Sequence, residues 1–94
     1  MILNFEPDAS ETIDDIVDFI ESINTEGSGR AWLVTFLQHL HSYAKSNVTY
    51  ALCQNQIFAE EGLSCITYKG WVIAFKIEFD EMIIYHIVRG SIIA

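Results

Sequence analysis

The sequence predicts a single α+β domain covering residues 1–94, with the element order β-α-α-β-β-β. Apolar residues recur at helical spacing in the N-terminal half, and in the C-terminal third they alternate with a period of two. Because helices and strands are segregated along the chain, we expect an antiparallel sheet rather than alternating βαβ units. The two helices are joined by a short glycine-containing segment, so they should pack as an αα-hairpin on one face of that sheet.

The N-terminal segment predicts a short edge strand followed by an amphipathic helix. The strand covers residues 1–6 and ends before Pro7, because proline cannot donate a hydrogen bond to a ladder. The helix is expected over residues 9–24, with Asp8 as its cap. Its acidic residues lie on the side opposite a single apolar stripe. That stripe consists of Ile13, Ile16, Val17, Ile20 and Ile23.

A second helix is expected over residues 30–46, after a break at 25–29 that contains two glycines. Beyond it the pattern weakens: residues 48–53 are compatible with a strand, and residues 54–61 are typical of a loop. The buried stripe of the second helix consists of Leu33, Phe36, Leu37, Leu40, Tyr43 and Ala44, with Trp32 at its edge.

The C-terminal third predicts a three-stranded antiparallel meander over residues 63–68, 71–79 and 82–88. Tight turns are expected at residues 69–70 and 80–81. The middle strand has the most regular alternation, so one of its faces should lie under the helices. The residues of that face are Trp71, Ile73, Phe75, Ile77 and Phe79.

The charge of the chain is strongly negative, with 13 acidic residues against five Lys and Arg and a net charge of −8. The first 26 residues contain eight acids and no Lys or Arg. Such a surface repels phosphate backbones, so we expect no nucleic acid partner for it as a whole. The chain starts without a basic leader, and no apolar run approaches the roughly 20 residues of a membrane span. We therefore expect a cytoplasmic protein without a membrane segment.

The two cysteines, Cys53 and Cys65, do not form a disulfide framework. They could form one bridge, but cytosolic thiols are usually reduced, and we expect two reduced, half-buried thiols. No cluster of His and Cys has the spacing of a zinc site, so we expect no metal and no cofactor.

Two segments resemble the RelE/ParE superfamily of toxins. Residues 5–16 read Phe-Glu-Pro-Asp-Ala-Ser-Glu-Thr-Ile-Asp-Asp-Ile, similar to the strand, proline and acidic first helix of that family. Residues 71–91 read Trp-Val-Ile-Ala-Phe-Lys-Ile-Glu-Phe-Asp-Glu-Met-Ile-Ile-Tyr-His-Ile-Val-Arg-Gly-Ser, similar to its closing hairpin. The resemblance covers nearly the whole chain and implies a type II toxin–antitoxin (plasmid stabilization) role with a cognate antitoxin as partner.

The family has two activities, and the resemblance leaves both open. RelE-like members cleave messenger RNA on the ribosome, which here implies catalytic roles for His86, Arg89, Tyr85 and Lys76. Tyr85 and His86 are neighbours in a predicted strand, so they should point to opposite faces. The family's cationic set is depleted in this chain, which has Leu63-Ser64 where members often have Leu-Arg.

ParE-like members act on DNA gyrase and often end their last strand in Leu-His-Gly, where this chain has Val-Arg-Gly at residues 88–90. That ending favours a ParE-like protein that acts by binding protein, with gyrase as one candidate target. The first alternative is a ribosome-dependent mRNA endonuclease, the one case in which the chain would be an enzyme. The second alternative is an inactive interaction or dimerisation domain.

The C-terminal residues Ile92 and Ile93, together with Arg89, are predicted to bind a partner. They follow the break at Gly90-Ser91, and burying each isoleucine would contribute roughly 1.5–3 kcal/mol. The cover would be the antitoxin or a second copy in a homodimer. The alternative is that both isoleucines fold back onto their own sheet.

Overall fold

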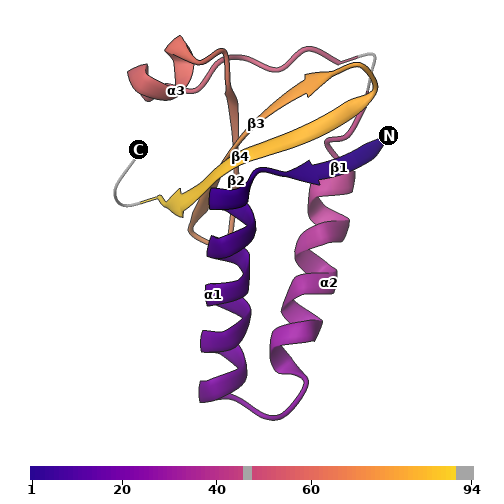
Figure 1. Cartoon of the computed structure of the whole chain (residues 1–94), viewed down its shortest axis with the longest axis vertical. Coiled ribbons are helices and arrows are strands. Elements are labelled where there is room, and N and C mark those ends of the chain that lie inside the picture. Colours follow the sequence, from indigo (N-terminus) through magenta and orange to yellow (C-terminus); the bar gives the residue numbers. More distant parts are fainter. Residues whose placement is uncertain (46–47, 91–94) are drawn as a thin grey trace.

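The computed structural model describes residues 1–45 and 48–90, and within them a helical hairpin packs against one face of a sheet (Figure 1). The strands of this described part form one four-stranded sheet in the order β1-β4-β3-β2. None of its helices is both long and apolar enough to cross a membrane. The elements are β1 (Ile2–Phe5), α1 (Pro7–Ile23), α2 (Ser28–His41), α3 (Gln56–Glu60), β2 (Ser64–Tyr68), β3 (Trp71–Glu78) and β4 (Glu81–Arg89).

The sheet is antiparallel across the predicted meander and parallel at its edge. β2 pairs with β3, and β3 pairs with β4, both antiparallel, which confirms the C-terminal prediction. The first strand joins the sheet edge as expected, but it pairs with β4 in parallel. The direction of β1 depends on the path that the chain takes through α1 and α2 before it returns, so no local pattern indicates it.

The helix boundaries differ from the predicted ones at both helices. α1 begins at Pro7, whose missing N–H is not needed at the first helical position, so the capping position is Glu6. The predicted Asp8 cap is therefore wrong. α2 ends at His41, where a turn begins, instead of continuing to residue 46, which lies outside the described residues.

The main core lies between the helix pair and the sheet. Aromatic rings of α2 meet the sheet there: the Phe36 ring stacks on Trp32 at 4.9 Å and lies 5.4 Å from the ring of Tyr68. Among the described residues, the buried members of this core are Ala9, Ile13, Ile16, Phe36, Leu40, Ile66, Tyr68, Ile73, Phe75, Met82, Ile84 and Ile87.

The predicted helix-facing register of β3 is confirmed for four of its five residues. Ile73 and Phe75 are buried, and Trp71 and Ile77 pack against the same core. Phe79 is 99% exposed, so its predicted place under the helices is wrong. The reason is that β3 ends one residue earlier, and Phe79 and Asp80 form the turn, both with positive φ.

The hairpin between α1 and α2 is closed by one carboxylate and one glycine. Glu21 accepts hydrogen bonds from the backbone N–H groups of Gly27 (2.6 Å) and Gly29 (2.9 Å), and these bonds lower the pKa of its carboxyl. At Gly29 an added Cβ would lie 2.6 Å from the carbonyl oxygen of Val17. The two helices therefore approach so closely that this position does not accommodate a side chain.

Candidate functional site

A β-bulge in β4 decides which face of the sheet carries the candidate residues. Ala74 pairs with His86 and Phe75 pairs with Ile84, which leaves Tyr85 as the extra residue on β4. The alternation therefore shifts by one, and Tyr85 packs on the outer face, away from the helices, where the His86 ring also lies. The prediction that these two side chains point to opposite faces is wrong.

The outer face carries a second, smaller core. Its partly buried residues include Tyr85 and Val88 of β4. The segment before β2 covers this face, and the short helix α3 forms within it, where a loop was predicted. Asn55 caps this helix by accepting a hydrogen bond from the Phe58 N–H at 3.1 Å, a capping signal that was present in the sequence. The buried residues of this outer core are Cys53, Phe58, Leu63 and Ala74.

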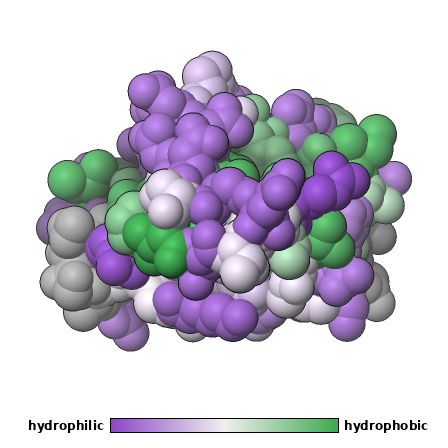
Figure 2. Space-filling view, turned by 90° about the horizontal axis from the view of Figure 1, so that it is seen from below, coloured by the Kyte–Doolittle hydropathy of each residue, from purple (hydrophilic) through white to green (hydrophobic). Residues whose placement is uncertain are grey.

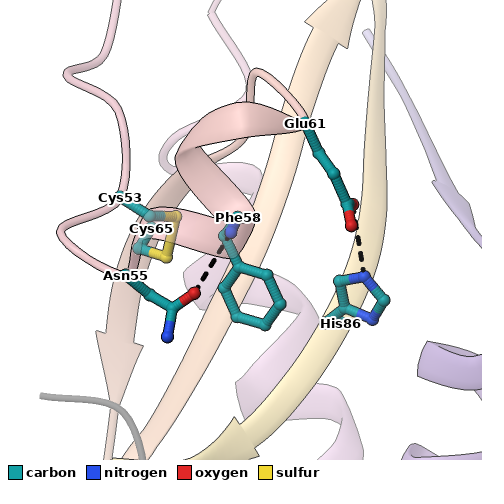
Figure 3. A network of polar contacts seen from close by, with 6 residues as sticks. All are labelled: Cys53, Asn55, Phe58, Glu61, Cys65 and His86. Atoms are coloured by element: carbon teal, nitrogen blue, oxygen red, sulfur yellow. Dashed lines mark hydrogen bonds and ion pairs between the residues drawn. A yellow bond between two sulfur atoms is a disulfide. The ribbon is translucent and has the colours of Figure 1, made fainter.

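His86 lies beside Phe58 and below Glu61, two residues of the segment that covers this face, as Figure 3 shows. Its ring stacks on that of Phe58, with centroids 4.9 Å apart and an interplanar angle of 9°. Its Nε2 lies 3.6 Å from a carboxylate oxygen of Glu61, which follows the helix. The His86 side chain remains 30% exposed, so its reactive nitrogen is partly shielded by two residues of the covering segment.

Lys76 and Tyr85 complete a group of three candidate residues on this face. The Lys76 ammonium lies 5.7 Å from the centre of the Tyr85 ring and 3.6 Å from the Glu78 carboxylate. Tyr85 and His86 have ring centroids 6.5 Å apart. The structure thus brings together a cation, a phenol and an imidazole, which are groups capable of charge stabilisation and proton transfer.

Arg89 lies on the helix side of the sheet, away from these three residues. Its guanidinium sits 4.7 Å from the centre of the Trp71 ring. Both line a groove of about 470 Å³ beside α1, together with Phe19 and Asp15. Phe19 is 62% exposed there, so the groove presents an aromatic surface with one cation and one carboxylate. Ile92 and Ile93, the other predicted partner-binding residues, lie outside the described residues.

Cys53 and Cys65 form a disulfide, with Cα atoms 4.9 Å apart, so the expectation of two reduced thiols is wrong. The backbone explains the pairing: the Cys53 N–H bonds to the Leu63 carbonyl at 2.9 Å, and Leu52 forms a bridge with Ser64. The segment before α3 therefore runs antiparallel beside the start of β2. The number and spacing of the cysteines in the sequence do not reveal that the two residues are close in space.

The surface at the tip of the helical hairpin is mainly polar. Figure 2, which views the molecule from the tip of the helical hairpin, shows hydrophilic residues with separate hydrophobic patches between them. The exposed apolar side chains of the hairpin include Phe19 and Ile23 on α1 and Val34 on α2. Within residues 1–45 and 48–90, no three His, Cys, Asp or Glu side chains are grouped closely enough to hold a metal ion.

Comparison with known proteins identifies the fold. No family model matches the chain, and no curated protein matches it. A solved structure described as "Chromosomal ParDE TA system from P. aeruginosa" superposes with a TM-score of 0.72 and 15% sequence identity, covering 95% of each chain. The chain has a RelE/ParE-like fold. The fold expected from the resemblance is thereby confirmed, and at 15% identity the likeness concerns the fold alone.

Proposed function

We propose that this chain is the toxin-like member of a type II toxin–antitoxin pair and acts by binding protein. The observation that carries the proposal is the fold shared over 95% of both chains with a protein of a ParDE toxin–antitoxin system. The net charge of −8 supports a protein target over a nucleic acid target, because phosphate backbones are repelled by an acidic surface. DNA gyrase is the candidate target within this proposal, and the cytoplasm is its proposed location.

The groove beside α1 is the proposed surface for the cognate antitoxin. Phe19 and Trp71 offer aromatic area, and Arg89 offers a cation for a carboxylate of the partner. An amphipathic segment with an apolar residue next to an acidic one matches this combination. Ile92 and Ile93, the other residues predicted to bind a partner, lie outside the described residues.

Controlled expression in a bacterial host tests the proposal. We expect growth arrest on induction, and rescue when the small protein encoded by the adjacent open reading frame is co-expressed. Phe19→Asp should abolish co-purification of that partner, whereas Val34→Asp, at an exposed apolar position on α2, should not. Growth unaffected by induction, together with no complex, would contradict the proposal. DNA supercoiling by purified gyrase, measured with and without the protein, tests the target separately.

A ribosome-dependent mRNA endonuclease is the second candidate function, because the bulge gathers Tyr85, His86 and Lys76 on one face. Against it, His86 is covered by Phe58, and Arg89 lies on the helix side with Trp71. We therefore expect no cleavage of free RNA or of messenger RNA on translating ribosomes. Codon-spaced cuts that vanish in the His86→Ala variant would replace the protein-binding proposal with this one.

The partner-binding role predicted for the two C-terminal isoleucines is tested by the oligomeric state. We expect the chain made without its antitoxin to form a homodimer or to be poorly soluble, because Ile92 and Ile93 add apolar surface at the C-terminus. Light scattering on the full chain and on a chain ending at Gly90 makes the comparison. If both proteins were soluble monomers, the two isoleucines would not be part of the proposed interface.

A further inference from the structure

The cover over His86 is a short chain segment closed at both ends by the disulfide. Cys53 and Cys65 are 12 residues apart, and α3 lies between them. Phe58 from this segment stacks on His86, and Glu61 lies 3.6 Å from the His86 Nε2 (Figure 3). The bridge therefore closes the segment whose residues shield the imidazole.

The disulfide is accessible from a cleft. A hollow of about 440 Å³ is lined by both cysteines and by neighbouring residues that include Leu52, Thr67 and Val72. Cys53 is only 6% exposed, whereas Cys65 is partly exposed, so Cys65 is the cysteine that we assign as the point of attack by an incoming thiolate. Thiol–disulfide exchange requires this kind of access to one sulfur atom.

We propose that Cys53–Cys65 is a redox site whose substrate is a dithiol reductant, and that its reduction uncovers His86. The reductant's thiolate attacks the Cys65 sulfur and forms a mixed disulfide, and the Cys53 thiolate leaves. The second thiol of the reductant then displaces Cys65. The two cysteines gain two electrons and two protons, and the dithiol becomes a disulfide. This site is distinct from the antitoxin groove, and the inference does not depend on the toxin-like function.

Release of the cover follows from how few other contacts hold it. Its apolar anchors in the outer core are Phe58 and Leu63, and its backbone is joined to itself by the Cys53 N–H to Leu63 carbonyl bond. Once the bridge is open, the segment regains the conformational freedom that the closed loop had removed. Segments with few buried contacts open locally at low free energy, so the reduced cover should expose His86 part of the time.

Acylation of histidines by diethyl pyrocarbonate, mapped by peptide mass spectrometry, tests the proposal on the full chain. His39 and His41 on α2 serve as internal controls, because α2 packs on the other side of the sheet. We expect treatment with dithiothreitol under native conditions to raise the His86 acylation rate about tenfold and to leave His39 and His41 unchanged. Thiol counting establishes that both cysteines are reduced.

A substitution in the covering segment distinguishes the effect of losing the cover from the effect of losing the disulfide. Phe58→Ala should raise His86 acylation in the oxidised protein, while Ile57→Ala, at an exposed position on the same helix, should not. Three results would overturn the proposal: no change at His86 after complete reduction, an equal rise at all three histidines, or a bridge that dithiothreitol does not reduce in the folded protein. An equal rise would mean that the bridge supports the whole fold rather than the cover.

Discussion

The two faces of the sheet are stabilised in different ways. In the described part of the chain, the helix face has a core of twelve buried residues covered by the long helices α1 and α2. The outer face has a core of four, covered by a five-residue helix, and it carries the disulfide. Hydrophobic burial scales with the apolar area removed from water, so a small cluster contributes little by itself. Where the apolar cover is thin, a covalent bridge takes over part of the stabilisation.

Removing a buried aromatic ring from each face should give the largest change in the free energy of unfolding and a clear difference between the two faces. Phe75→Ala empties a site in the helix-face core, where the side chain is 1% exposed, and should lower the free energy of unfolding by roughly 4–5 kcal/mol. Phe58→Ala on the outer face should cost roughly 3 kcal/mol, because the small cluster can relax around the loss. Urea unfolding followed by circular dichroism measures both. Equal losses would show that the two faces do not differ as described.

Removing the bridge should have the next largest effect, and its local consequences should be greatest on the outer face. The double substitution Cys53→Ser with Cys65→Ser should lower the free energy of unfolding by about 3 kcal/mol, because the unfolded chain loses a loop constraint. Reduced wild-type protein is the matched control and should lose a similar amount. Hydrogen exchange should accelerate more in residues 54–63, which open locally, than in α2, which exchanges by unfolding of the whole domain. Unchanged stability of both proteins would mean that the outer core holds without the bridge.

Gly29→Ala tests how tightly the helix pair is packed. The added Cβ would lie 2.6 Å from the Val17 carbonyl oxygen, so the helices must separate, at a cost of about 2 kcal/mol. Gly27→Ala is the control, since no atom lies within 4 Å of its Cβ and only its φ of 88° is unfavourable, at a cost of about 1 kcal/mol. Thermal unfolding ranks the two. A Gly29→Ala protein as stable as wild type would contradict the close approach.

A substitution in the turn between β3 and β4 should stabilise the protein. Phe79 and Asp80 adopt φ of 51° and 63°, a conformation that favours Asn and Gly over a bulky ring. Phe79 is also almost fully exposed, so its replacement removes no core contact. Phe79→Asn should therefore raise the free energy of unfolding by roughly 0.5–1 kcal/mol. A loss of stability in urea unfolding would indicate that the Phe79 ring makes a stabilising contact in spite of its exposure.

Glu21 should give the smallest effect, visible as a pH dependence of the hairpin. Its folded pKa is lowered by the hydrogen bonds from Gly27 and Gly29, so its contribution to stability is present above the unfolded pKa of about 4.3. That contribution is lost as the pH falls through the lower, folded pKa. Glu21→Gln should therefore flatten the loss of stability that wild type shows as the pH falls through this range. If the free energy of unfolding fell with decreasing pH equally in wild type and in Glu21→Gln, this carboxylate would not stabilise the hairpin.

Local periodicity was sufficient for most of the helices and strands. The apolar stripe of α1 and the alternation of β3 are properties of a few consecutive residues, because the repeat of a helix or a strand is set by the backbone itself. The order of these elements then predicted the α+β fold and the two-helix cover. The group on the outer face was only half predictable: the candidate residues could be named, but not the face on which each lies.

What the sequence alone determined is therefore the identity and order of the elements, the acidity of the chain, and the resemblance in its two end segments. The tertiary structure decided the rest. The bulge that turns Tyr85 to the face of His86 depends on the register of β4 against β3. The disulfide depends on the approach of the segment before α3 to β2, and the parallel edge depends on the return path of the chain. Each is a relation between two segments of the chain, and a pattern within either segment contains no information about it.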